Sequence, residues 1–172
     1  MLELILTLIC LTGTFSNAAQ DVSWKEFTSD EGRFTVSLPG ELQQPRVMVT
    51  NTSKGTFYTH LVSSTDKGLN QYTVAWTDRQ KESIEQSATE KIFDKVRKGL
   101  LIANNAKLVG ESADQLEGYP SRTMTLLAAD GRLITARFSF VKNRFYELMA
   151  QIKTEDKESG ERFLNSFKLL RN

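Results

Sequence analysis

Residues 134–152 read ITARFSFVKNRFYELMAQI, and here apolar and polar side chains alternate more clearly than anywhere else in the chain. Alternation with a period of two is typical of a β-strand that buries one face. The Lys142-Asn143 pair in the middle is typical of a turn, so the stretch predicts a hairpin of two antiparallel strands. We expect the centre of the core to consist of the apolar positions of this hairpin: Ile134, Ala136, Phe138, Phe140, Tyr146, Leu148, Ala150 and Ile152.

Shorter alternating runs on the N-terminal side of this hairpin predict the other strands of an antiparallel sheet. The breaks between them fall at Pro39-Gly40, at a Ser53-Lys54-Gly55 turn and at Asp130-Gly131, and these are residue types that turns favour. The expected strands cover residues 24–27, 32–38, 46–50, 56–62, 71–77, 106–110 and 122–127.

Two segments change to the period of an α-helix. In residues 83–104 apolar side chains recur every four positions with charged residues between them, and Ser83 and Gln86 resemble a capping box at the start. A shorter helix is expected over residues 156–167. The order of elements predicts an α+β fold, in which a long amphipathic helix and a short C-terminal helix cover an antiparallel β-sheet.

Residues 1–19 have the pattern of a secretory signal peptide. The continuous apolar stretch at residues 4–11 ends in small and polar residues, and it is too short for a membrane span, which needs about twenty apolar residues. We expect cleavage after Ala18 or Ala19 and export to the periplasm or the extracellular space. No stable transmembrane segment is expected after cleavage.

Two features of this leader leave alternatives open. Glu3 stands where a signal peptide carries a basic residue, and a start codon upstream would explain it. Cys10 is a candidate for lipidation, but Ile9 before it is larger than the residue that a lipoprotein signal favours. An uncleaved leader that stays as a membrane anchor is disfavoured by the same length argument.

Residues 20–172 have the length and composition of a single domain. The full chain carries 22 basic and 21 acidic residues, with a formal net charge of +1 and no long block of one sign. This excludes the strongly basic surface of a nucleic-acid-binding protein. The one histidine is His60, and the one cysteine, Cys10, lies in the leader. A zinc site built from histidines or thiolates therefore cannot form from the mature chain alone.

Residue patterns for catalysis are weak. His60 lies in an expected strand beside Tyr58 and Val62, which favours a structural histidine over a catalytic one. A serine–histidine–aspartate triad would have to use His60, and the chain has no Gly-x-Ser-x-Gly turn. Ser64 and Lys67 match a Ser-x-x-Lys pattern, but they fall in an expected turn rather than on a helix. We expect no catalytic residue, no metal and no cofactor.

Arginines are the remaining candidates for a binding surface. Arg33, Arg137 and Arg144 form the expected surface binding patch, on the outward face of the sheet, with Arg122 and Arg132 as further members. Such a patch would suit an anionic lipid head group, a glycan or an acidic protein. The alternative is a set of separate arginines that keep an exposed sheet face in solution.

Several stretches of the chain resemble exported bacterial proteins of unassigned function in the PsbP-like group. They are WKEF at 24–27 leading into EGRFTVSLPG at 31–40, EGYPSR at 117–122 and FLNSFKLL at 163–170. The fold of this group is shared with photosystem accessory proteins and with a nuclear Ran-binding protein of the Mog type. The resemblance implies one PsbP-like domain over residues 20–172, an α/β/α sandwich. Its motifs are structural, so it implies binding and assembly roles and supplies no catalytic residues.

These observations predict a non-catalytic extracytoplasmic binding or assembly module that acts through surface contacts with a protein or a membrane-associated complex. Such a module would expose a contiguous patch of aromatic and arginine side chains. An alternative is a carrier or sensor for a small amphipathic ligand held between helix and sheet, in a groove lined by Trp76 and Tyr58. A third is a hydrolase that uses carboxylates alone, which requires two acidic side chains in one cleft.

Overall fold

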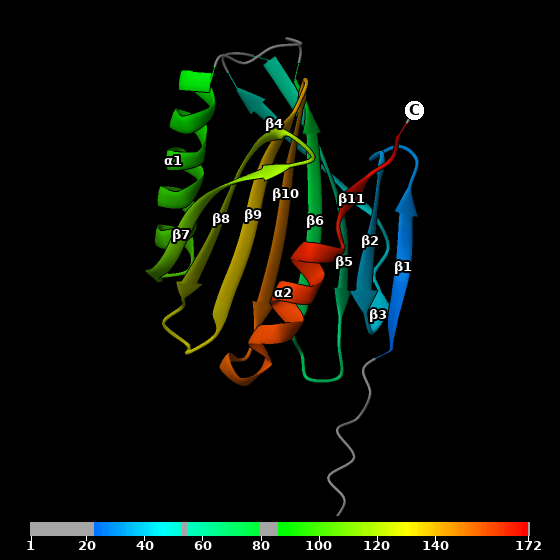
Figure 1. Cartoon of the computed structure of the whole chain (residues 1–172), viewed down its shortest axis with the longest axis vertical. Helices are drawn as coiled ribbons and strands as arrows, with labels where there is room; N and C mark the ends of the chain where they lie inside the picture. The colour runs from blue at the N-terminus through cyan, green and yellow to red at the C-terminus, as the bar shows by residue number, and fades with distance from the viewer. Residues whose placement is uncertain (1–22, 53–54, 80–85, 172) are drawn as a thin grey trace, which may run out of the picture.

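The computed structural model of this chain describes residues 23–52, 55–79 and 86–171. The expected leader at residues 1–19, the Ser53-Lys54 part of one turn and the expected capping residue Ser83 lie outside the described residues. Figure 1 shows the elements in chain order: β1 (Trp24–Ser29), β2 (Phe34–Pro39), β3 (Glu41–Leu42), β4 (Arg46–Thr52), β5 (Gly55–Thr65), β6 (Gln71–Asp78), α1 (Gln86–Ala103), β7 (Lys107–Leu116), β8 (Tyr119–Leu127), β9 (Leu133–Val141), β10 (Arg144–Ile152), a 3₁₀ turn (Thr154–Asp156), α2 (Lys157–Ser166) and β11 (Lys168–Leu169).

The strands form two antiparallel sheets, not the single sheet that the sequence predicted. The small sheet has the order β1-β2-β11, and the large sheet has the order β3-β5-β6-β10-β9-β8-β7, with β4 paired to β5. Strands make up 57% of the described residues and helices 20%. The prediction of one sheet covered by a long amphipathic helix and a short C-terminal helix was therefore wrong, because the described protein is mostly β and its strands form two sheets.

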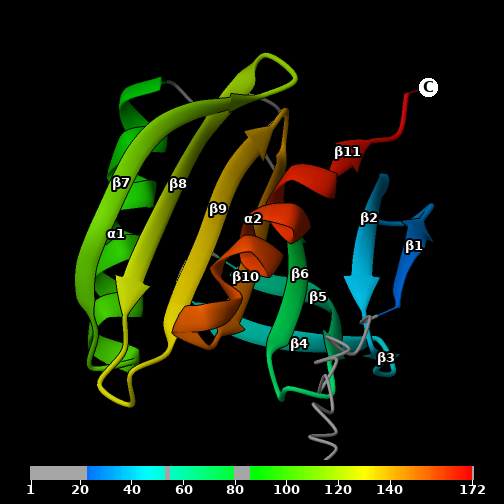
Figure 2. The ribbon, with the colours of Figure 1, turned by 60° about the horizontal axis from the view of Figure 1, so that its bottom comes forward.

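Different layers pack on the two faces of the large sheet (Figure 2). On one face, the small sheet and α2 share a core that combines Phe34 of β2, Trp76 of β6, Leu148 of β10 and Phe163 of α2. On the opposite face, α1 packs through Phe93 against apolar residues of β8, β9 and β10. The long helix thus packs on one face of the large sheet, and the small sheet packs on the other face together with α2. The period of a helix predicts which side of it is apolar, but not how much of a sheet it covers.

All eight expected core residues of the β9–β10 hairpin are buried, as predicted. They do not all lie on the same face of the sheet. In the register Ser139 lies opposite Tyr146, and Phe138 lies opposite Glu147. Residues opposite each other in an antiparallel pair point to the same face. The apolar residues of β9 therefore face α1, whereas those of β10 face α2 and the small sheet. The two alternating runs fill two cores on opposite faces, not one.

Most expected elements are present with shifted ends. The described part of the long helix lies within residues 83–104. The strand expected at residues 106–110 continues to Leu116, because the chain turns only at Glu117-Gly118, where both residues have a positive φ. None of the helices in the described ranges is long and apolar enough to cross a membrane.

Candidate functional site

Arg144 begins β10 and is held by bonds to both sheets. Its Nε donates to Asp78 Oδ1 at 2.6 Å, its Nη2 to Asp78 Oδ2 at 2.8 Å and its Nη1 to the carbonyl oxygen of Glu31 at 2.7 Å. Asp78 ends β6 of the large sheet, whereas Glu31 lies in the β1–β2 turn of the small sheet. The hydrogen bonds between the two side chains raise the pKa of Arg144 and lower the pKa of Asp78. Arg144 is therefore a fixed positive charge at the junction of the sheets.

Tyr146 and Arg33 lie beside Arg144 at this junction. The Tyr146 hydroxyl donates to the carbonyl oxygen of Gly32 at 2.7 Å. Burial raises the pKa of Tyr146, and the charges of Arg144 and Arg33 oppose this shift. The guanidinium carbon of Arg144 lies 6.0 Å from the centre of the Tyr146 ring. Arg33 and Arg144 line one surface hollow with a volume of about 430 Å³. We call it the basic hollow, defined by its charged lining residues Arg33, Asp78, Glu117, Lys142, Arg144 and Arg171.

The third residue of the expected patch, Arg137, lies outside the basic hollow. It stands on β9 and its guanidinium donates to the carbonyl oxygen of Leu164 at 2.9 Å and to Thr123 Oγ1 at 3.1 Å, while Asp114 Oδ2 lies 3.5 Å away. Burial lowers the pKa of Arg137, and Asp114 opposes this shift. These contacts tie the end of α2 to β8 and β9. Alternation placed Arg137 on the opposite face from its apolar neighbours, but it could not show that α2 covers that face.

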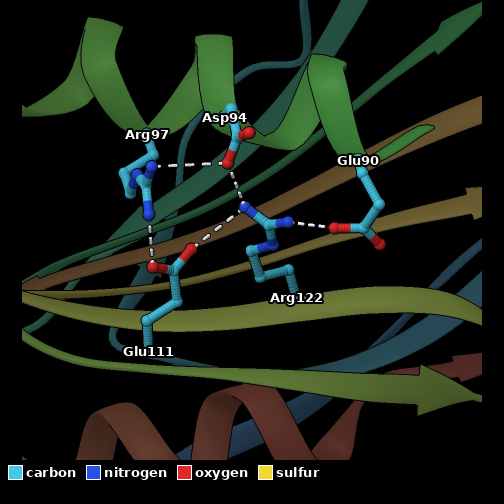
Figure 3. Close-up of polar contacts among 5 residues, drawn as sticks. All are labelled: Glu90, Asp94, Arg97, Glu111 and Arg122. Atoms are coloured by element: carbon cyan, nitrogen blue, oxygen red, sulfur yellow. Dashed lines mark hydrogen bonds and ion pairs between the residues drawn. The ribbon is translucent and has the colours of Figure 1, made fainter. Parts of the chain in front are cut away.

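Arg122, also expected on the outward face, is joined to α1 (Figure 3). It pairs with Glu90 of α1, with Asp94 of α1 at 2.7 Å and with Glu111 of β7 at 3.1 Å. Arg97 of α1 makes two more pairs, with Asp94 and Glu111. The two arginines of this cluster thus meet three carboxylates, which fits a structural link between α1 and the sheet and leaves no positive excess for an anion.

Two more residues from the sequence analysis make structural contacts. Arg132, in the β8–β9 turn, donates to the carbonyl oxygen of Leu69 at 3.1 Å. His60 stacks on Trp76, with ring centroids 5.1 Å apart and planes 14° from parallel, and its Nδ1 lies 3.2 Å from Glu31 Oε1. Trp76 is buried in the core. These contacts fit a structural role for His60. Arg132 is not among the residues that line the basic hollow.

Large apolar side chains are exposed on the β4–β5 hairpin. Val47, Met48 and Val49 of β4 and Tyr58 of β5 each expose 55% of their surface. We call these four residues the apolar ribbon. Arg46 beside them is also exposed. The sequence predicted the hairpin but not its exposure, and the signal that points to it is the Val-Met-Val run, which departs from strict alternation.

Two carboxylates converge on Asn70, outside both of these surfaces. The Asn70 Nδ2 donates to Asp66 Oδ2 at 3.0 Å and to Asp156 Oδ2 at 2.8 Å. The Tyr72 hydroxyl donates to Asp66 Oδ2 at 3.3 Å, and burial raises the pKa of Tyr72 to about 12. Both carboxylates therefore accept internal hydrogen bonds. This arrangement fits a clamp between the β5–β6 turn and the start of α2 better than the acid and base of a hydrolase.

Glu147 of β10 is an acidic side chain in apolar surroundings. It lies opposite Ala75 of β6 and Phe138 of β9, on the face of the sheet that carries α1. Burial raises the pKa of its carboxyl group. No side-chain hydrogen bond or ion pair among the described residues includes Glu147, so we expect its charge to cost stability at neutral pH.

Comparisons with known proteins support the fold. No known family model matches this sequence, and no curated protein matches it significantly. The solution structure of cyanobacterial PsbP (CyanoP) from Synechocystis sp. PCC 6803 is similar, with a TM-score of 0.58 and 10% sequence identity over 88% of this chain and 95% of that chain. A crystal structure of PA94 from Pseudomonas aeruginosa, a protein of unknown function, has a TM-score of 0.38 and 11% identity over 80% of this chain and 88% of that one, which is too low to define a shared fold. The chain therefore has a PsbP-like fold.

Proposed function

We propose that this protein is a non-catalytic extracytoplasmic binding module, which docks a protein partner or a membrane-associated complex on the apolar ribbon. The observation that carries the proposal is the exposure of large apolar side chains on one hairpin, where Val47, Val49 and Tyr58 share one face and Met48 lies on the other. Exposed apolar residues that lie singly need no explanation, but a contiguous patch of them is typical of an interaction site.

The geometry of β4 supports one mode of binding for such a partner. Val49 lies opposite Tyr58, so these two side chains share one face of the hairpin, while Met48 lies opposite Thr59 on the other face. Among the described strands β4 pairs with β5 alone. Its outer edge therefore offers backbone N–H and C=O groups to an added strand. A partner protein that presents an extended segment with apolar side chains fits both the edge and the ribbon.

The composition of the ribbon supports a protein partner over a small ligand. Tyr58 accompanies Val47 and Val49 on one face of the hairpin, and Arg46 accompanies Met48 on the other. Aromatic and arginine side chains are enriched in protein interfaces. In the rival function, a carrier would hold an amphipathic ligand between helix and sheet. Phe93 of α1 is fully buried there, and its ring packs 5.7 Å from that of Phe140 and 6.5 Å from that of Phe145. Close packing at this position favours the module over the carrier.

Export is the other part of the proposal. It rests on the signal-like pattern of residues 1–19, which lie outside the described residues, and it places the partner in the cell envelope or outside the cell. The net charge of +1 supports a partner other than a nucleic acid.

The test is affinity capture from envelope extract with two matched double variants. Val47→Lys/Val49→Lys places two charges on the apolar ribbon, and Ile102→Lys/Val109→Lys places two charges at apolar positions that are 82% and 62% exposed elsewhere. We expect the wild-type protein and the second variant to retain the same defined protein, and the first variant to lose it. Retention of that protein by the first variant, or no specific protein on the wild type, would contradict the proposed function.

A further inference from the structure

Four segments that are far apart in the sequence meet at the basic hollow. The β1–β2 turn contributes Arg33, the β7–β8 turn Glu117, the β9–β10 turn Lys142, and the segment after β11 contributes Arg171. Figure 1 shows these turns at the same end of the molecule as the C-terminus. The hollow, of about 430 Å³, lies within the size range of small-ligand sites.

The hollow has an excess of positive charge that its own carboxylates do not neutralise. Of its two carboxylates, Asp78 binds Arg144 through both oxygens, and Glu117 accepts a hydrogen bond from the backbone N–H of Leu169 at 2.9 Å. Arg33, Lys142 and Arg171 are exposed, and no ion pair or side-chain hydrogen bond links them to another described residue. Cations gathered around a concave surface raise the local concentration of anions.

Two of these cationic residues, Arg33 and Lys142, have a positive backbone φ, which residues other than glycine rarely adopt. Five non-glycine residues in the described ranges have a positive φ, and three of them line the hollow: Arg33 at 58°, Glu117 at 48° and Lys142 at 56°. Each such residue costs backbone energy that glycine would avoid. Residues held in this way gather at functional sites more often than elsewhere.

We propose that the basic hollow binds a phosphate group, carried either by a small phosphate ester or by an anionic phospholipid. Arg33, Lys142 and Arg171 contact the phosphate oxygens, and Arg144 adds a fixed charge beside them. Phosphate fits better than carboxylate because it offers three or four oxygens and up to two negative charges to cations that approach from separate segments. Leu169 also lines the hollow and gives the carbon skeleton of the ligand an apolar contact.

The experiment measures binding of two probes by the purified protein. One probe is inorganic phosphate, followed by calorimetry with acetate as the reference anion, and the other is vesicles of phosphatidylglycerol, with phosphatidylcholine vesicles as the reference. The test variant is Arg33→Gln/Lys142→Gln/Arg171→Gln. The control is Lys91→Gln/Lys95→Gln/Lys98→Gln, which removes the same charge from exposed positions of α1.

We expect the test variant to weaken binding by at least about tenfold, and the control to change it by less than about twofold. Saturable binding of inorganic phosphate with this pattern identifies a soluble phosphate ester as the source of the ligand. Binding to phosphatidylglycerol vesicles alone, with the same pattern, identifies a lipid head group. The proposal is overturned if neither probe binds, if both variants lose binding equally, or if acetate binds as tightly as phosphate. The apolar ribbon is unchanged in all these variants, so this result is independent of the proposed docking function.

Discussion

Asp78 receives two hydrogen bonds from Arg144, at 2.6 and 2.8 Å, and the same arginine reaches across to the carbonyl oxygen of Glu31 in the other sheet. The carboxylate thus orients the guanidinium that joins the small sheet to the large one. Asp78 itself is more than half exposed, so solvent screens much of the attraction between the two charges. We therefore expect Asp78 to act mainly by orienting the guanidinium of Arg144.

The Asp78→Asn variant tests this ion pair. We expect the free energy of unfolding at pH 7 to fall by about 1 kcal/mol. The hydrogen bonds from Arg144 lower the pKa of Asp78 in the folded state. The stabilisation is therefore present above the pKa of the unfolded carboxyl, about 4, and is lost as the pH falls through the lower folded value. Urea denaturation at a series of pH values should show the difference between variant and wild type shrinking below about pH 4.

Glu26→Gln is the matched control, because Glu26 is exposed on β1 and makes no ion pair with another described residue. It should leave stability within about 0.5 kcal/mol of the wild type at every pH. An Asp78→Asn variant as stable as the wild type at pH 7 would show that the pair makes no net contribution.

The Asn70→Ala variant tests the clamp between the β5–β6 turn and α2. Asn70 is 2% exposed, and its side chain also accepts a hydrogen bond from the backbone N–H of Lys153 at 2.9 Å. Its removal leaves Asp66 and Asp156 without their shared donor, so we expect a loss of about 2–4 kcal/mol in the free energy of unfolding. Asn165→Ala removes an exposed amide with one long contact, at 3.3 Å, and should cost less than about 1 kcal/mol. Equal losses in the two variants would argue against the clamp.

Glycine-to-alanine changes in the two helices should have opposite effects. Gly99 in α1 has no atom within 4 Å of where a Cβ would lie, so Gly99→Ala should stabilise by about 1 kcal/mol through helix propensity. At Gly160 in α2 the Cβ would lie 2.8 Å from Ile152 Cδ1 in the buried core. We expect Gly160→Ala to destabilise by about 1–2 kcal/mol. Thermal denaturation of both variants measures the difference.

A second substitution separates the steric cost at Gly160 from other causes. Ile152→Val removes Cδ1, so the cost of Gly160→Ala should shrink by more than half when it is introduced into Ile152→Val. A cost that stays the same in both backgrounds would show that the contact between helix and strand is not its origin.

The Glu147→Gln variant tests the half-buried carboxyl group of Glu147. Desolvation raises its folded-state pKa, so the folded protein holds this proton more tightly than the unfolded chain does, and stability falls as the pH rises through the folded value. We expect Glu147→Gln to be more stable than the wild type by about 1 kcal/mol at pH 7, and to lose this advantage below about pH 4. Guanidinium denaturation at the two pH values checks both statements. A less stable Glu147→Gln at pH 7 would mean that the charged carboxylate has a favourable partner.

Local patterns in the sequence predicted much of the secondary structure. The alternation in residues 134–152 led to two strands with eight buried side chains, and all eight are buried. It did not lead to the right layers, because a strand in the middle of a covered sheet buries both faces, and the apolar face of β9 and that of β10 then point to different partners. The period of a strand also does not show which strands pair with each other. One sheet was therefore expected, whereas β1, β2 and β11 form a second one.

The sequence by itself determined most of the strands, both helices and the eight core side chains of the β9–β10 hairpin, since period and turn residues act over a few neighbouring positions. Only the tertiary structure decided that Arg33 and Arg144 share a hollow while Arg137 binds the end of α2. It also decided that Val47, Met48, Val49 and Tyr58 are left uncovered. The physical reason is that the position of a charge relative to other charges, and the covering of an apolar face, depend on segments that are far apart in the chain. Their meeting is set by sheet order and layer packing, which no local period encodes.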